Sequence, residues 1–195
     1  HGLLSDVTYP SLAGTSVDRD FVELPSQLFE HWLEQPEVLE RFARHQATGA
    51  PIPAALAARL HAARNADQGF ATVEYTAAAL TDLDLHATAP AGDFDIGRFE
   101  RETLARIGMP EAIVLRHRPA HFAHVFAGGY ASGYYSYLWS EVLDADGFAA
   151  FVEAGDAFDP CVARRLKEHV YAAGNRQEPR AAYRAFRGRD PDVRA

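Results

Sequence analysis

The chain has 195 residues, of which 48% are hydrophobic, and its formal net charge is -8 at neutral pH. This length and composition are typical of a globular protein with one substantial core. The negative charge argues against nucleic acid and anionic membranes as partners. No apolar run approaches the roughly 20 residues that a membrane span needs. The single cysteine, Cys161, excludes an intrachain disulfide and a four-cysteine zinc site.

Hydrophobic spacing predicts a mostly α-helical chain with few or no strands. The first predicted helix begins at Ser16, a suitable N-cap, and Pro25 is expected either to kink it or to divide it into two abutting helices. Residues 111–127 show no helical period and are expected to hold a short extended piece. Further helices are predicted over residues 36–45, 53–65, 70–80, 95–107, 148–154, 160–172 and 179–186. Asp95 is the expected cap of the helix at 95–107, and one more helix is expected to run from the tyrosine-rich stretch, described next, to about residue 143. Residues 86–92 are expected to form a linker.

The stretch from His124 to Trp139 holds four of the chain's eight tyrosines, just after a pair of glycines. At 100° per residue, three of these tyrosines share one stripe of the predicted helix. A row of phenols beside His124 suits hydrogen bonding to a developing oxyanion, and packing at the edge of the core is the alternative. The three are Tyr130, Tyr134 and Tyr137, and the side chains expected to be buried instead are Tyr135, Leu138, Trp139 and Val142.

Two carboxylates, Asp20 and Glu23, lie one helical turn apart in the first predicted helix. This spacing suits a metal-ligating carboxylate and a second carboxylate that orients it, although carboxylates on a helix face are more commonly solvated. Arg19 beside them is a candidate for contact with an anionic end group. The three histidines within residues 117–124 have ligand-like spacing, H-x3-H-x2-H, but Pro119 argues against the single helix that would bring them together.

Three stretches together resemble the thimet oligopeptidase family of zinc metallopeptidases, and most closely its bacterial peptidyl-dipeptidase branch. The first, His1 to Gln27, includes Arg-Asp-Phe-Val-Glu-Leu-Pro-Ser-Gln and resembles the segment that follows the family's H-E-F-G-H zinc helix. The second is Gln68 to Tyr75, and the third is Phe122 to Ser140. The resemblance extends over essentially the whole chain, and the first and third stretches are its most specific parts.

The resemblance implies the multi-helix C-terminal part of a zincin-like peptidase, which uses one zinc ion to hydrolyse short peptides and release C-terminal dipeptides. It matches Glu23 to the family's third zinc ligand, with Asp20 as the orienting carboxylate. It also matches several residues to contacts with the substrate or the transition state. These are His124, Tyr130 and Tyr137 as catalytic residues, and Tyr134, Gly128, Gly129 and Arg19 as substrate-binding residues.

The family's H-E-x-x-H motif does not occur in this sequence, so two zinc histidines and the general-base glutamate are lacking. We therefore expect residues 1–195 to form a single but incomplete portion of a catalytic domain that is inactive alone. The expected partners are short peptides and the missing N-terminal half of the same protein, with neither nucleic acid nor membrane among them. The cytoplasm is the expected compartment, and the periplasm is the alternative.

Two other functions are compatible with the same residues. One is an oligopeptidase that cleaves internal bonds of short peptides. The other is a non-catalytic helical module that binds peptides or partner proteins through the tyrosines. Release of C-terminal dipeptides further requires a group that holds the substrate carboxylate, and the candidates are Arg19, Arg184, Arg187 and Arg189.

Overall fold

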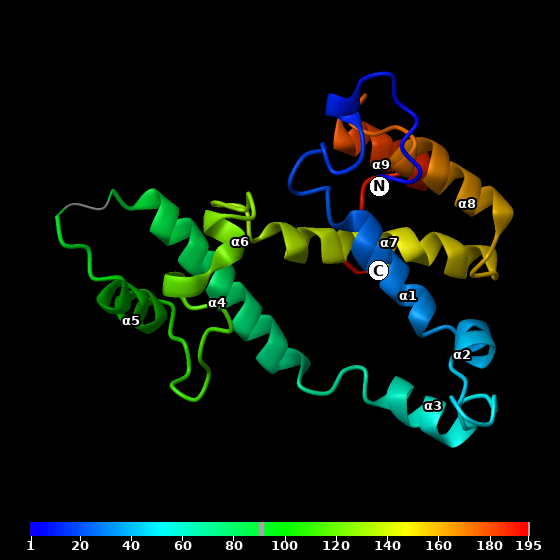
Figure 1. The fold of residues 1–195 in the computed structure, drawn as a ribbon, viewed down its shortest axis with the longest axis horizontal. Helices are drawn as coiled ribbons and strands as arrows, with labels where there is room; N and C mark the ends of the chain where they lie inside the picture. Colours follow the sequence, from blue (N-terminus) through cyan, green and yellow to red (C-terminus); the bar gives the residue numbers. More distant parts are fainter. Residues whose placement is uncertain (90–91, 195) are drawn as a thin grey trace. The chain divides into compact units, whose positions relative to one another are not determined.

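The computed structural model describes residues 1–89 and 92–194. These residues are mostly helical, which confirms the predicted fold class, and their one extended pairing is an isolated bridge between Arg44 and Pro51. Short turns of 3-10 helix lie at Pro10–Leu12 (η1) and Pro119–His121 (η2), and a π-helical turn lies at Lys167–Tyr171 (η3). The α-helices are α1 (Leu24–Leu33), α2 (Pro36–Phe42), α3 (Ala54–Ala62), α4 (Gln68–Ala87), α5 (Ile96–Arg106), α6 (Ala123–Phe126), α7 (Ser136–Ala154), α8 (Pro160–Leu166) and α9 (Pro179–Arg187) (Figure 1).

The contacts between Cα atoms divide the chain into two compact units. The first unit combines His1–Arg64 with Tyr137–Ala195, and the second is the continuous segment Asn65–Ser136. That the two units together form one portion of a catalytic domain stays a prediction. None of the described helices is long and apolar enough to cross a membrane.

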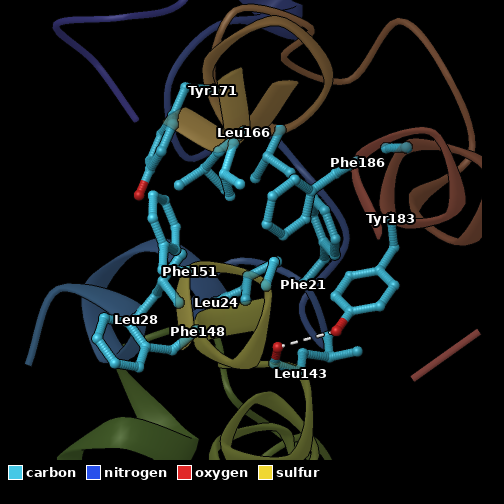
Figure 2. Close-up of a cluster of buried hydrophobic side chains, with 14 residues drawn as sticks. Phe21, Leu24, Leu28, Leu143, Phe148, Phe151, Leu166, Tyr171, Tyr183 and Phe186 are labelled. Atoms are coloured by element: carbon cyan, nitrogen blue, oxygen red, sulfur yellow. Dashed lines mark hydrogen bonds between the residues drawn. The ribbon is translucent and has the colours of Figure 1, made fainter. Parts of the chain in front are cut away.

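The hydrophobic core of the first unit is built by α1, α7, α8, η3 and α9 (Figure 2). Leu24 and Leu28 of α1 are completely buried there. A Cβ added to Gly147 of α7 would lie 3.5 Å from Leu28 Cδ1, which is ordinary van der Waals distance between α1 and α7. From α9, Tyr183 and Phe186 enter the same core, and the Tyr183 hydroxyl donates to the backbone oxygen of Leu143 at 3.1 Å. Burying each side chain of this size contributes about 2–3 kcal/mol.

A buried carboxylate, that of Asp146 in α7, fastens α9 and the residues after it to this core. Asp146 Oδ2 accepts hydrogen bonds from the Tyr183 hydroxyl at 2.6 Å and from Arg187 Nε at 3.2 Å, and Arg189 also pairs with the carboxylate. Arg187, whose side chain is 5% exposed, also donates to Glu153 at 2.6 Å. Burial and the Asp146 hydrogen bond raise the pKa of Tyr183. Two arginines considered for carboxylate binding, the buried Arg187 and the exposed Arg189, are therefore already paired with a carboxylate of the protein.

Two helices start later than the sequence predicts. The first begins at Leu24 instead of Ser16, because Pro25 falls in its first turn, where the missing N–H is not needed. Pro25 therefore starts the helix and does not kink it, and residues 16–23 form bends and turns. The tyrosine-rich stretch becomes helical only at Ser136 and then continues unbroken to residue 154, which merges two predicted helices.

The region around the predicted linker agrees with the sequence in part. The linker at 86–92 overlaps the last residues of α4, and its residues 90–91 lie outside the described residues. Asp95 caps α5 as predicted, because its Oδ1 accepts the backbone N–H of Arg98 at 2.9 Å. Residues 111–127 contain η2 and α6, and the part of them expected to be extended, residues 113–115, is assigned to neither a helix nor a strand.

Candidate active site

His124 lies in α6, half-buried in a cluster of aromatic rings of the second unit. Its ring centroid is 5.0 Å from that of His117, 5.5 Å from Tyr134 and 6.2 Å from Tyr130. The buried ring of Phe122 meets Tyr134 edge-on at 4.7 Å. Burial and the neighbouring His124 lower the pKa of His117. The structure thus brings together three predicted site residues, namely His124, Tyr130 and Tyr134.

The predicted helical stripe of tyrosines is wrong for two of its three members. Tyr130 and Tyr134 lie in turns that precede α7 and are only 9% and 8% exposed. Between them, Ser132 has a φ of +53°, in the left-handed region that a helix cannot contain. The turn, and not a helix face, brings both rings to His124. Only Tyr137 belongs to α7.

Gly128 and Gly129 shape the turn that joins His124 to Tyr130. A Cβ at Gly128 would lie 2.9 Å from the backbone oxygen of His124, closer than real Cβ contacts. Gly129 has a φ of +77°, which glycine adopts at little cost. The backbone therefore folds back over α6, and the N–H of Tyr130 donates to the His124 oxygen at 3.0 Å. This gives the glycine pair a steric role, and substrate binding by it stays a prediction.

Asp82 of α4 organises the tyrosine turn, and sequence reasoning missed it. Its carboxylate is completely buried and accepts the backbone N–H of Ser132 at 3.1 Å and that of Tyr134 at 3.0 Å. His86 Nδ1, one turn along the helix, lies 2.8 Å from Asp82 Oδ1. The sequence did contain a signal for a buried aspartate here, because Asp82 follows the apolar run 77–80 closely and lies four residues before a histidine.

Tyr75 of α4 supports the same turn from the side. Its ring stacks on that of Tyr134 with centroids 5.1 Å apart, and its hydroxyl donates to the Tyr134 backbone oxygen. Burial, and then the charge of Glu74, raise the pKa of Tyr134, so this phenol is protonated at neutral pH. Stretch 68–75, which carries part of the family resemblance, therefore holds Tyr134 in place.

Glu23 occupies the N-cap position of α1 and is half-buried. The hydroxyl of Ser26 donates to Glu23 Oε2 at 2.8 Å, and the backbone N–H of Gln27 donates to the Glu23 backbone oxygen at 3.0 Å. The prediction that Asp20 and Glu23 share a helix is wrong, because residues 19–23 are turns. Asp20 instead borders a pocket of about 450 Å³ in the first unit, which Trp139 also lines.

Tyr137 is the second residue of α7 and is half-buried. Its backbone oxygen accepts a hydrogen bond from Gln27 Nε2 of α1 at 3.2 Å. Three neighbours that the sequence placed inside are exposed instead, namely Tyr135 at 43%, Leu138 at 40% and Trp139 at 43%. Arg19 is also exposed, in the turn before α1.

The predicted site residues fall in both units. The first unit contains Arg19, Asp20, Glu23 and Tyr137, and the second contains His124, Gly128, Gly129, Tyr130 and Tyr134. Within residues 1–89 and 92–194, no group of three or more His, Cys, Asp or Glu side chains is arranged to hold a metal ion. These residues alone therefore do not fit a complete zinc site, and Glu23 is the one predicted ligand that the chain offers.

The comparisons with known proteins agree with the resemblance seen in the sequence. The model of peptidase family M3 matches residues 1–195. Dipeptidyl carboxypeptidase of Salmonella typhimurium is 39% identical over 196 residues, which cover 99% of this chain and 28% of that protein. The Escherichia coli enzyme of the same name is 38% identical over 195 residues, with 99% and 28% covered. Oligopeptidase A of Escherichia coli is 38% identical over 203 residues, with 100% and 29% covered.

The chain thus spans less than a third of the length of these relatives. The match nevertheless extends from the first residue to the last, so it includes both compact units. All three sequence stretches that carried the resemblance lie within it. The resemblance to the thimet oligopeptidase family is confirmed, and the chain belongs to peptidase family M3.

Proposed function

We propose that this chain is part of a zinc-dependent peptidyl-dipeptidase that removes dipeptides from the C-terminal end of short peptides. The observation that carries the proposal is the family match over all of residues 1–195, together with 39% and 38% identity to two proteins named dipeptidyl carboxypeptidase. Because the matched region is only 28% of each of these relatives, the proposed enzyme is a longer parent protein that contains this chain.

Glu23 is the proposed zinc ligand of this chain. Its position at the start of α1 supports this role, because the backbone there is fixed by the helix and Ser26 holds one carboxylate oxygen. A zinc site needs three or four protein groups, and the described residues offer no such set. We therefore propose that the isolated chain is inactive and that the other ligands belong to the parent protein.

Three side chains are the proposed hydrogen-bond donors to the reacting peptide. Tyr130 and Tyr137 are the proposed donors to the scissile carbonyl oxygen as it gains negative charge, and His124 is the proposed donor to another part of the substrate. The close contact of His124 with the two buried tyrosines supports this grouping for the second unit. Tyr134 adds a further neutral phenol, since burial and Glu74 raise its pKa.

An oligopeptidase is the second candidate, and the 38% identity to oligopeptidase A favours it. The two activities differ in what they require of the substrate. A peptidyl-dipeptidase must recognise the free C-terminal carboxylate, whereas an oligopeptidase cleaves internal bonds without it. A non-catalytic peptide-binding module is the third candidate, and the lack of grouped metal ligands in the described residues favours it for the isolated chain.

Two peptides that differ only in a free or an amidated C-terminus separate these candidates. Each is incubated with the parent protein and with the isolated chain, with and without a chelator, and the products are identified by mass spectrometry. The proposal expects chelator-sensitive release of a dipeptide from the free acid by the parent protein alone. Internal cleavage of both peptides supports the oligopeptidase. Turnover by the zinc-supplemented chain, or none by the parent protein, overturns the proposal.

A further inference from the structure

Gln27 is hydrogen-bonded to two predicted site residues at once. Its backbone N–H donates to the Glu23 oxygen at 3.0 Å, and its side-chain Nε2 donates to the Tyr137 oxygen at 3.2 Å. Glu23 begins α1 and Tyr137 lies in the first turn of α7, so one residue connects the starts of the two helices. All three belong to the first compact unit.

The contact between α1 and α7 continues one turn further along α1 and two turns further along α7. Residues 23, 27 and 31 follow each other at intervals of four on α1, which places them on one face of the helix. His31 Nε2 lies 2.6 Å from Asp144 Oδ1, and the His31 ring stacks on Phe148 with centroids 4.8 Å apart. These contacts join the middle of α1 to α7. Gln27 joins the two helices at the N-terminal end of α1, next to Glu23.

The side chain of Gln27 is poorly suited to a purely structural role. Its Oε1 is buried and has no hydrogen-bond partner in the described part of the chain. Rotating the amide would direct this oxygen at the Tyr137 oxygen, so that two acceptors faced each other. An unpaired buried acceptor is unfavourable for stability, whereas an apolar side chain of the same length would avoid it. The geometry therefore indicates that glutamine is present at position 27, in place of an apolar residue, because its Nε2 donates to the Tyr137 oxygen.

We propose that Gln27 is a positioning residue that fixes the start of α7, and with it Tyr137, relative to Glu23. The proposal rests on the proposed peptidase function. It assigns Gln27 no contact with substrate or metal. Substitution of the amide should therefore change the rate of catalysis while leaving folding and metal binding nearly unchanged.

The first test observes the carbonyl carbon of Tyr137 in the chain by NMR. Tyr137-Leu138 is the only Tyr-Leu pair in the sequence, so carbonyl-13C tyrosine with 15N leucine yields one correlation peak. Gln27→Met should move this carbon to lower chemical shift, since it loses a hydrogen-bond donor. Gln35→Met is the matched control, because Gln35, the N-cap of α2, donates through Nε2 to the backbone oxygen of His31 in α1 and not to Tyr137. An unmoved peak in Gln27→Met overturns the proposal.

The second test measures kcat, KM and zinc content of the parent protein with the same substitutions. Gln27→Met should lower kcat by about tenfold to a hundredfold with little change in KM, as expected when a group is misplaced by about 1 Å. Zinc content and melting temperature should stay close to the unaltered protein, and Gln35→Met should leave kcat unchanged. Gln27→Glu, which has the same shape but no donor when ionised, should repeat the loss.

The outcomes separate this proposal from the function on which it rests. If the unaltered parent protein shows no chelator-sensitive turnover, the proposed function fails, and the positioning role fails with it. If the unaltered protein is active and both Gln27 variants retain its kcat, the positioning role alone is overturned. If zinc content falls together with kcat, Gln27 acts on metal binding, and the proposal is again overturned.

Discussion

The buried carboxylate of Asp82 fixes the backbone of Tyr134, because it accepts the Tyr134 N–H at 3.0 Å. The same carboxylate accepts the N–H of Ser132, and His86 lies against it. A carboxylate with this many partners fixes the path of the turn that carries Tyr130 and Tyr134. The aromatic cluster around His124 therefore depends on a residue that is not itself aromatic.

Replacing Asp82 should destabilise the fold more than replacing its neighbour Asp84. Asp82→Ala leaves several buried donors unpaired, and we expect the free energy of unfolding to fall by about 3 kcal/mol. Asp84 pairs with Arg106 at the surface, so Asp84→Ala should cost less than about 1 kcal/mol. Urea denaturation of the chain measures both values, and equal losses would contradict the role of Asp82.

The two glycine positions 128 and 69 should respond in opposite directions to alanine. Gly128→Ala places a Cβ 2.9 Å from the His124 backbone oxygen, and the strain should cost about 1–3 kcal/mol. Gly69 lies at the start of α4 with open space around it, so Gly69→Ala should stabilise by about 0.5–1 kcal/mol. Thermal and urea unfolding test the signs, and a stable Gly128→Ala variant would show that the turn can relax.

Removing the hydroxyl of Tyr137 should reduce catalysis without affecting folding. Tyr137→Phe in the parent protein should lower kcat by about a hundredfold, the usual loss for one oxyanion donor. Tyr135→Phe is the matched control, because that residue is exposed and only two positions away. Steady-state kinetics on a short peptide distinguishes them. Equal activity of the two variants would assign Tyr137 to packing.

Glu23 should be required for zinc binding by the parent protein. Glu23→Gln removes the charged ligand, and we expect zinc affinity to fall by at least about a hundredfold. Glu30→Gln, at an exposed position of the same helix, should retain full metal content. Metal analysis after dialysis against a weak chelator provides the measurement. Retention of zinc by Glu23→Gln would remove this residue from the proposed site.

Asp190 should make the stability of the first unit dependent on pH in the acidic range. Arg180 and Arg184 of α9 donate to its carboxylate at 2.8 and 2.5 Å and hold its pKa well below the usual range. Because the unfolded value is about 3.9, the pairing stabilises the fold above that pH and is lost as the pH falls below it. Asp190→Asn should therefore differ most from the unaltered chain near pH 6.

Urea titrations between about pH 2 and pH 6 test this dependence. The difference between Asp190→Asn and the unaltered chain should shrink as the pH falls. A difference that stays constant with pH would mean that the arginine pairs do not act through the charge of Asp190.

The sequence predicted those elements whose signals are local. The helix predicted at 179–186 matches α9 within one residue, since Pro179 starts it and Glu178 caps it by accepting the Ala181 N–H. The prediction that three tyrosines share one helix face was wrong because hydrophobic spacing does not reveal the positive φ of Ser132. Asp82 was missed because its partners lie 50 and 52 residues away in the chain. Family resemblance supplied the functional assignments, and the roles of the individual site residues stay predictions.

The division of the chain into units also sets an order of assembly. The second unit is one continuous segment, so all of its contacts are available once residue 136 has been synthesised. The core of the first unit instead needs Leu24 and Leu28 to meet residues from Leu143 onward, across more than a hundred positions. Contacts of such long range form late, because the intervening chain must first be ordered. Until α7 has been synthesised, the apolar face of α1 therefore lacks the α7 residues that bury it.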